Sequence, residues 1–237
     1  MICLLKESPF STEKTRGAKS RRAIISETIN RGRDDGHDQK KENSSEFMGF
    51  GKDYFDGGDK SLGYGSYRYD GRYSKAIEKI IKDYRLNPEM IIFEAGCAKG
   101  FIVQEFLQRG FLKSFGQDIS EYAISSANEK CKAHLKIGSI NSIQSSDESV
   151  DFLYSKEVLP HMSEGDIKLF LSECNRVLKK NGQIILEIQY SNSAKGRELM
   201  KIWDPTHVTL FSKEEWLNLI KNKFNKCGLF IHFKELF

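Results

Sequence analysis

The sequence contains no apolar run that approaches the roughly 20 residues needed to cross a bilayer. Its first residues, 1–6, are apolar over too few positions to act as a secretory signal. We therefore expect no membrane span, and the cytoplasm is the expected compartment.

A concentration of charge of one sign is also lacking. The formal net charge is only +4, and the basic residues are interleaved with acidic ones rather than gathered in a stripe. Proteins that bind a nucleic-acid duplex usually present a concentrated basic face. The sequence therefore predicts no nucleic-acid partner.

Paired cysteines are missing as well. The five cysteines are odd in number and far apart, and none belongs to a Cys-x-x-Cys pair. Neither a disulfide framework nor a zinc site follows from such spacing. We expect reduced thiols and no bound metal.

What is present divides into an extension and one domain. Residues 1–47 are rich in Arg, Lys, Asp, Ser and Gly over most of their length, so they bury too little apolar surface to offset the entropy of ordering. We expect this extension to be disordered. Residues 48–237 can form one good-sized core, and their first part, residues 48–88, holds an aromatic and glycine-rich loop (54–73) and a helix (73–84).

From residue 90 onward, short apolar runs alternate with helical stretches. The expected strands are 90–93, 114–116, 135–137, 150–154, 183–188 and 229–233, and the expected helices are 101–108, 121–130, 165–178 and 213–224. Such alternation is typical of βαβ units. The sequence predicts an α/β fold, a Rossmann-like three-layer sandwich with a mostly parallel sheet.

A glycine loop follows the first of these strands and leads into the helix 101–108. It reads Glu94-Ala95-Gly96-Cys97-Ala98-Lys99-Gly100, and the free backbone N–H groups at such a turn allow a ligand to approach closely. Its Gly-x-x-x-Gly spacing differs from the Gly-x-Gly-x-x-Gly that contacts a dinucleotide pyrophosphate. Glu94 would repel a pyrophosphate but attract a cationic or amino-bearing ligand.

A second acid, Asp118, stands at the end of the next strand, 24 positions after Glu94. An acid at this place can accept hydrogen bonds from ribose hydroxyls. The two acids together suit a nucleoside that carries a positive charge and an amino group, and S-adenosylmethionine matches that description.

From about residue 50 onward the sequence resembles the class I S-adenosylmethionine-dependent methyltransferases, in particular their small-molecule, type 11-like branch. Four ordered segments carry the resemblance: 94–100, 116–120, 149–161 and 176–183. The resemblance implies a Rossmann-like fold, S-adenosylmethionine as the cofactor, and methyl transfer as the activity. The expected cofactor-binding residues are Glu94, Gly96, Cys97, Ala98, Gly100, Asp118, Ile119, Ser139, Ile140 and Ser155.

The sequence departs from that family in two places. Relatives often have an acid that contacts the adenine amino group where this chain has Ser139, so the serine hydroxyl or the backbone of Ile140 is expected to make that contact. The family sheet normally ends in an antiparallel seventh strand, for which the sequence offers no good candidate. Either that strand is missing or an earlier segment fills the edge.

Two histidines are candidates for contact with the methyl acceptor. His161 follows the fourth strand, at the edge where open α/β sheets bind ligands, and His207 lies in the polar and aromatic stretch 203–209. Histidine suits a general base near neutral pH. We favour His207 slightly over His161, and a purely structural role stays open for both.

Four tyrosines precede the first helix of the domain: Tyr64, Tyr67, Tyr69 and Tyr73. They could form a lid that holds a sulfonium against aromatic faces by cation–π contact. Ordinary packing of this segment on the sheet explains them equally well.

The predicted function is S-adenosylmethionine-dependent transfer of a methyl group to a small-molecule acceptor, with an oxygen of a sugar or of a lipid-linked precursor as the expected target. Fold-level analogy does not fix this substrate. One alternative is a catalytically degenerate protein of the same fold that binds a cofactor or a partner. An NAD-dependent oxidoreductase is a further alternative, but the glycine spacing and Glu94 count against it.

Overall fold

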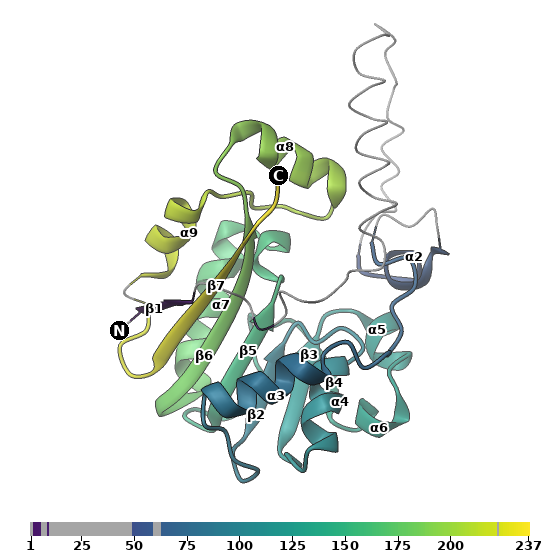
Figure 1. Ribbon diagram of the computed structural model, residues 1–237, viewed down its shortest axis with the longest axis vertical. Helices are drawn as coiled ribbons and strands as arrows, with labels where there is room; N and C mark the ends of the chain where they lie inside the picture. The colour runs from purple at the N-terminus through teal and green to yellow at the C-terminus, as the bar shows by residue number, and fades with distance from the viewer. Residues whose placement is uncertain (1, 6–8, 10–48, 59–62, 222) are drawn as a thin grey trace, which may run out of the picture.

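A seven-stranded parallel sheet forms the centre of the protein. The computed structural model describes residues 2–5, 9, 49–58, 63–221 and 223–237 (Figure 1). The strand order is β1-β7-β6-β5-β2-β3-β4, and every neighbouring pair is parallel. The strands are β1 (Ile2–Leu5), β2 (Ile92–Ala95), β3 (Ser114–Asp118), β4 (Leu135–Ile137), β5 (Val150–Lys156), β6 (Leu178–Tyr190) and β7 (Gly228–Glu235).

The helices connect these strands and flank the sheet. They are α2 (Lys52–Asp56), α3 (Ser74–Asp83), α4 (Phe101–Gln108), α5 (Glu121–Ser125), α6 (Glu129–Lys132), the 3₁₀ helix η2 (Leu159–His161), α7 (Glu164–Val177), α8 (Ala194–Trp203) and α9 (Lys213–Ile220). Within the described ranges, none of them is long and apolar enough to cross a bilayer.

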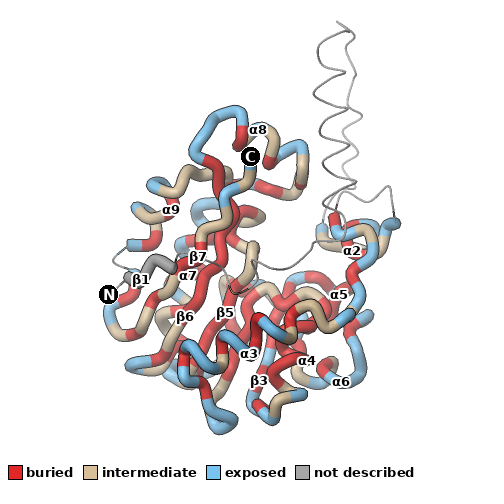
Figure 2. The backbone as a smooth tube through the Cα atoms, viewed as in Figure 1, coloured by how far each residue is buried: buried red, intermediate tan, exposed pale blue. Residues whose placement is uncertain are grey.

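Side chains on both faces of the sheet are buried against helices. Phe93, Leu153 and Ile184 pack in one core cluster with residues of α7 and α9, whereas their neighbours Ile92 and Phe152 pack in another with α3 and α4. Successive residues of a strand point to opposite faces, and a parallel sheet covered on both faces needs apolar residues on each. The buried strands lie between the two helical layers (Figure 2), so the predicted three-layer α/β fold is confirmed.

Several predicted helix boundaries are wrong. The expected helix 121–130 is divided into α5 and α6 because Asn128 begins a new helix, its side chain accepting a hydrogen bond from the backbone N–H of Lys130. Helix α9 ends at Ile220, four residues before the expected end. The sequence patterns also missed α2 and α8, whereas α4 begins and ends as predicted.

The outer edge of the sheet next to β7 is filled by the start of the chain. Residues Ile2–Leu5 form β1 and pair in parallel with Leu229–His232. An earlier segment therefore fills the edge, and no strand in the described ranges runs antiparallel to its neighbour. The disorder expected for residues 1–47 is wrong for these four residues, and nearly all of the remaining extension lies outside the described residues.

Residues 49–58 and 63–73, here called the cap, lie over the carboxyl ends of β2 and β3. The Ser120 hydroxyl donates a hydrogen bond to the Phe50 carbonyl, and Asp56 accepts hydrogen bonds from Lys99 and Tyr122. The cap includes the described part of the predicted aromatic loop (54–73), and the short helix α2 begins two residues before that loop. These contacts hold it beside the glycine loop.

Candidate active site

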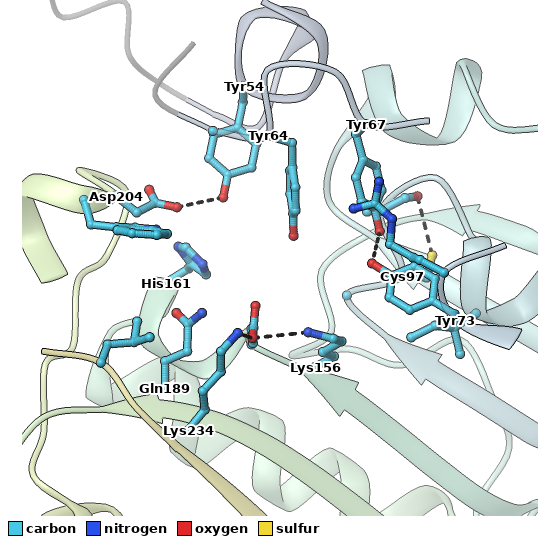
Figure 3. Close-up of a pocket in the computed structure, with 18 of the residues that line it drawn as sticks. Tyr54, Tyr64, Tyr67, Tyr73, Cys97, Lys156, His161, Gln189, Asp204 and Lys234 are labelled. Atoms are coloured by element: carbon cyan, nitrogen blue, oxygen red, sulfur yellow. Dashed lines mark hydrogen bonds and ion pairs between the residues drawn. The ribbon is translucent and has the colours of Figure 1, made fainter. Parts of the chain in front are cut away.

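Two connected chambers lie between the cap and the carboxyl ends of the central strands. The larger has a volume of about 430 Å³ and the smaller about 280 Å³. The residues that line both are Tyr54, Tyr64, Gly96, Ala98, Lys156, Glu157 and His161. The two chambers are therefore parts of one site, and the larger one is shown in Figure 3.

The glycine loop forms part of the floor of both chambers. Gly96 has a positive φ of 75°, and a Cβ there would stand 2.4 Å from Cγ2 of Val158. Of the residues expected to bind the cofactor, Gly96 and Ala98 line both chambers and Cys97 lines the larger one. Gly100 lines neither. It begins α4 with a φ of 71°, and a Cβ there would meet Leu135 at 2.6 Å, so its role is helix start and close packing rather than cofactor contact.

Glu94 is the next-to-last residue of β2, and its side chain lies in the wall of the larger chamber. The side chain is 6% exposed, and among the described residues its Oε2 has no hydrogen-bond partner. Burial raises the pKa of Glu94 well above its usual value, and the nearby charge of Asp118 adds to this effect. An ammonium group in the chamber would supply both the missing partner and the missing positive charge. The site therefore fits an amino-bearing ligand at this position.

Asp118 joins the end of β3 to the glycine loop. Its Oδ2 accepts a hydrogen bond from the backbone N–H of Ala98 at 2.7 Å, and its Oδ1 accepts one from Ser120 N–H at 2.8 Å. Each carboxylate oxygen retains a further lone pair. Asp118 lines the smaller chamber together with Ile119, Ser139 and Ile140, which is the place expected for ribose binding.

The smaller chamber contains an amide oxygen that the sequence prediction missed. Gln117 Nε2 donates to the carbonyl oxygens of Ser139 and Ser142 at 2.7 and 3.0 Å, and thereby holds the loop after β4. Asn141 lines this chamber, and its Nδ2 donates to Asp166 at 2.8 Å. Among the described residues its buried Oδ1 has no partner, so Asn141 is better placed than Ser139 to accept a hydrogen bond from an adenine amino group. The sequence signal that could have pointed to Asn141 is its position, two residues after Ser139.

Ser155 lies away from both chambers, contrary to the prediction. It is fully buried in β5, and the alternation of side chains along a strand turns it to the opposite face from Lys156. Lys156 and the following Glu157 line both chambers instead.

Three of the four tyrosines considered for a lid line the larger chamber. Tyr64, Tyr67 and Tyr73 line the larger chamber, the rings of Tyr64 and Tyr67 have centroids 4.3 Å apart, and the hydroxyls of Tyr67 and Tyr73 are 3.2 Å apart (Figure 3). Tyr69 is the exception, because its hydroxyl donates to Glu105 on α4 at 2.8 Å. Tyr54 in α2, which was not predicted, is the fourth tyrosine of the chamber.

The end of the larger chamber formed by residues at the ends of β5, β6 and β7 is polar. Lys156 Nζ lies 3.0 Å from Glu187 and 3.2 Å from Glu157, and Lys234 Nζ donates to Glu157 at 2.7 Å. Burial opposes ionisation of Glu157, but the two lysines outweigh it and hold its pKa well below the usual range. Gln189 and Lys234 lie side by side on this wall (Figure 3). The end of the chamber therefore offers both charged and neutral hydrogen-bonding groups.

The two candidate histidines lie together but differ in exposure to the site. The ring centroids of His161 and His207 are 4.7 Å apart, yet only His161 lines the chambers. His207 is 1% exposed, and its Nδ1 is 3.1 Å from the carbonyl oxygen of Met200. The structure therefore reverses the order of preference: His161 faces the site, and His207 lies behind it.

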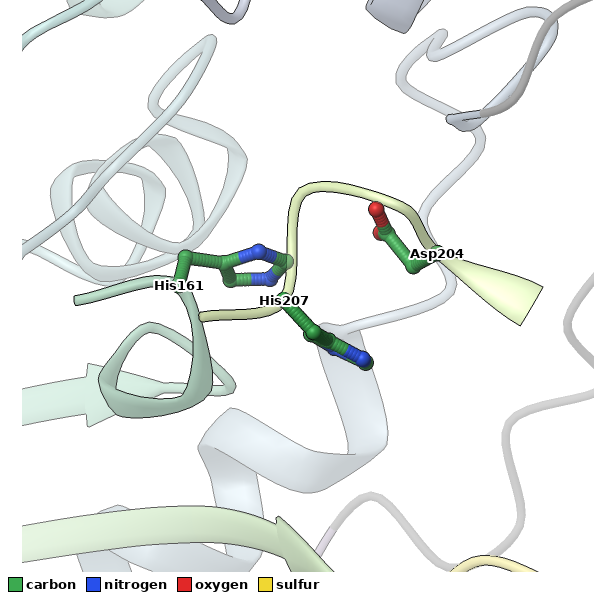
Figure 4. A group of neighbouring side chains, drawn as sticks. All are labelled: His161, Asp204 and His207. Carbon is green, nitrogen blue, oxygen red and sulfur yellow. The ribbon is translucent and has the colours of Figure 1, made fainter. Parts of the chain in front are cut away.

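Hydrogen bonds tie His161 to the loop after α8. Its Nδ1 lies 2.8 Å from Thr206 Oγ1, which donates to Asp204 Oδ1 at 2.6 Å. The Tyr54 hydroxyl donates to the other oxygen of Asp204 at 2.9 Å. One ligand atom each of His161, Asp204 and His207 lies within 4.8 Å of the other two, so these three neighbouring residues (Figure 4) could hold a metal ion.

Residues 93–186 match the family model described as a methyltransferase domain. The matched segment runs from β2 to β6 and contains the glycine loop, Asp118 and His161. No curated protein matches the chain in sequence.

Solved methyltransferase structures share the fold. The YcgJ protein from Bacillus subtilis is 20% identical with a TM-score of 0.54, over 62% of this chain and 66% of that one. A SAM-dependent methyltransferase from Archaeoglobus fulgidus is 18% identical with a TM-score of 0.50, over 63% and 68%. Geranyl diphosphate C-methyltransferase from Streptomyces coelicolor A3(2), in complex with Mg²⁺, geranyl diphosphate and S-adenosyl-L-homocysteine, is 14% identical with a TM-score of 0.50, over 67% and 66%. The chain thus spans about two thirds of the length of these proteins.

The parallel sheet, the glycine loop with its two acids and the match of residues 93–186 to a methyltransferase domain are features of the class I S-adenosylmethionine-dependent methyltransferases that the sequence resembles. The resemblance seen in the sequence is confirmed. The cofactor of this class is S-adenosylmethionine, and the unpartnered Glu94 oxygen and the left-handed Gly96 fit its amino-acid end.

Proposed function

We propose that the protein transfers the methyl group of S-adenosylmethionine to an oxygen of a small hydroxylated acceptor, a sugar or a lipid-linked precursor. The observation that carries this proposal is the pair of connected chambers, with the two acids at one end and an aromatic and polar space at the other. His161 stands where the two chambers meet.

The cofactor side is supported by three groups that each match one part of a sulfonium nucleoside. Glu94 suits the amino group, Asp118 the ribose hydroxyls and Asn141 the adenine amino group. When bound, the cofactor supplies a methyl group already activated on a positively charged sulfur. The cap residues Tyr64 and Tyr67 line this region and present aromatic faces to it.

The acceptor side is supported by the walls of the larger chamber beyond Glu157. Trp203 and Tyr54 provide aromatic surface there, while Gln189, Lys234 and Glu235 add hydrogen-bonding groups. A hydroxylated ring needs this combination of a flat apolar wall and a few convergent polar groups. The volume of the whole larger chamber, about 430 Å³, lies in the range of small-molecule sites.

The protein must align the acceptor oxygen with the methyl group and help its proton to leave. In the reaction a carbon–oxygen bond forms, the carbon–sulfur bond breaks with its electron pair going to sulfur, and the hydroxyl proton passes to solvent with His161 as its first acceptor. Burial lowers the pKa of His161 below its usual value, so the imidazole is uncharged near neutral pH. A neutral imidazole between the chambers accepts a hydrogen bond from the acceptor hydroxyl and thereby orients it.

The test uses S-adenosylmethionine with a labelled methyl group and a panel of free sugars, sugar nucleotides and lipid-linked sugars. We expect one acceptor class to take up the label as an alkali-stable ether. His161→Ala should reduce turnover by about 100-fold or more while changing S-adenosylhomocysteine affinity by less than about threefold. Label on carbon or nitrogen would contradict the proposed acceptor atom, and cofactor binding without any turnover would favour the degenerate alternative.

A further inference from the structure

Beside the acceptor space, one group of side chains has the composition of a metal site. His161, Asp204 and His207 come from η2, the end of α8 and the loop before α9, and one donor atom of each lies within 4.8 Å of the others (Figure 4). We propose that this group binds a divalent transition-metal ion at the edge of the larger chamber. The binding of an ion does not depend on the proposed function, whereas the ion's action on the acceptor does.

Hydrogen bonds determine which nitrogen of each imidazole is available to an ion. The Met200 carbonyl can only accept, so His207 Nδ1 carries the proton at 3.1 Å from it, and Nε2 keeps its lone pair. Thr206 Oγ1 gives its hydrogen to Asp204, so it accepts from His161 Nδ1 at 2.8 Å and leaves that Nε2 unprotonated too. Metal-binding histidines usually donate their other ring N–H to a carbonyl, carboxylate or similar oxygen in this way.

The charges of the group suit a cation. Ligation requires neutral imidazoles, each with its ring N–H directed at an oxygen that accepts it, which is how the Met200 carbonyl and the Thr206 hydroxyl are placed. Asp204, which is 5% exposed, supplies the negative charge. Its oxygens accept hydrogen bonds from Tyr54 and Thr206, but carboxylate oxygens have further lone pairs for an ion.

The donor set also indicates which ions to expect. Two imidazoles with one carboxylate suit Zn²⁺, Co²⁺, Fe²⁺ or Mn²⁺, whereas Mg²⁺ and Ca²⁺ prefer oxygen ligands alone. Donor atoms around an ion with bonds of about 2.1 Å stand roughly 3 to 3.5 Å apart. Binding should therefore draw the three side chains together from their present separation of up to 4.8 Å.

The position of the group gives the ion a role. Three protein ligands leave at least one coordination position open, and because His161 and Asp204 line the larger chamber, that position faces the acceptor. With the ion bound, His161 Nε2 is a ligand, so the ion takes over from the imidazole in holding the acceptor hydroxyl. That hydroxyl would lose its proton to solvent more readily, since the ion stabilises the negative charge left on oxygen. The oxygen is then ready to form its bond to the methyl carbon.

Titration of the full-length, chelator-treated protein with metal salts alone tests this inference. We expect one Zn²⁺ per chain by calorimetry, visible absorption bands on addition of Co²⁺, and no heat from Mg²⁺. His161→Ala and His207→Ala should each weaken Zn²⁺ binding by about 100-fold, and Thr206→Val, which removes only a positioning contact, by about tenfold. His134→Ala is the matched control and should leave affinity unchanged, because that ring contacts Ser114 outside the site.

The inference is overturned if the folded wild-type protein binds neither Zn²⁺ nor Co²⁺, or if both variants at 161 and 207 keep wild-type affinity. In either case the contacts form only a hydrogen-bonded network that joins Tyr54 to the loop after α8. Circular dichroism checks that the variants fold. If His207→Ala does not, wild type and His161→Ala still decide the question. S-adenosylhomocysteine binding is measured separately. If the protein binds S-adenosylhomocysteine but no metal, only this inference is rejected. If it binds metal but no S-adenosylhomocysteine, only the proposed function is rejected.

Discussion

Substitution of Glu94 by glutamine should separate the recognition of the amino-acid part of the cofactor from that of its nucleoside part. Glutamine keeps the size of the side chain and one oxygen, so the change removes little besides the negative charge. Oε2 of Glu94 is buried at the chamber wall and has no partner among the described residues. A charged hydrogen bond from a ligand ammonium group to such an atom contributes about 1.5–3 kcal/mol. Its loss corresponds to roughly 10- to 150-fold weaker binding.

Calorimetry with two ligands measures this difference. S-adenosylhomocysteine carries the amino group and should bind the Glu94→Gln variant that much more weakly. 5′-Methylthioadenosine lacks the amino-acid part, so its affinity should be the same in wild type and variant. Equal weakening of both ligands, or no weakening of either, would refute the assignment of Glu94 to the amino group.

The same variant makes a prediction about stability in the absence of ligand. Burial raises the pKa of Glu94 above its unfolded value, so wild-type stability is lost as pH rises through the raised pKa. Glutamine does not titrate. Thermal melting should therefore show Glu94→Gln at least as stable as wild type at pH 8, with the difference vanishing near pH 4. A variant that is less stable at pH 8 would show that the buried carboxylate is compensated within the protein.

Three further substitutions test the site, and Gly110→Ala serves as a control for the first. Gly96→Ala and Gly110→Ala both place a side chain on a residue with positive φ, which destabilises the fold by about 1–2 kcal/mol each. Only the new side chain at 96 meets neighbouring atoms, so only Gly96→Ala should also weaken S-adenosylhomocysteine binding in calorimetry. Equal effects of the two variants on binding would contradict the close approach at Gly96. Asn141→Ala should weaken S-adenosylhomocysteine binding by about tenfold and its inosine analogue much less; equal loss for both would remove Asn141 from adenine recognition. Asp56→Asn weakens the contact with Lys99 that holds the cap, and should speed S-adenosylhomocysteine dissociation in stopped-flow by roughly fivefold, as expected for about 1 kcal/mol; an unchanged rate would show that this contact does not retain the ligand.

The parts of the site that could be predicted from sequence are those that depend on local chain geometry. The glycine loop and Asp118 follow directly after strands, so their place at the sheet edge is a consequence of the βαβ pattern. Helix α4 was predicted to the residue because it has a glycine at its start and a strong apolar pattern.

The errors concern side-chain direction and contacts between distant segments. Ser155 is one residue from Lys156, yet a strand turns the two to opposite faces. His207 lies next to His161 but behind it, which depends on the fold of the loop after α8. The contact between Tyr54 and Asp204 joins residues 150 positions apart, and no periodicity in the sequence encodes such a pairing.

The most direct test of the central claim is calorimetric titration of the wild-type chain with S-adenosylmethionine, S-adenosylhomocysteine and NAD⁺. The account predicts one binding site per chain for each sulfur nucleoside and no detectable binding of NAD⁺. Binding of NAD⁺ in preference to both sulfur nucleosides, or failure of either sulfur nucleoside to bind the folded protein, would contradict it.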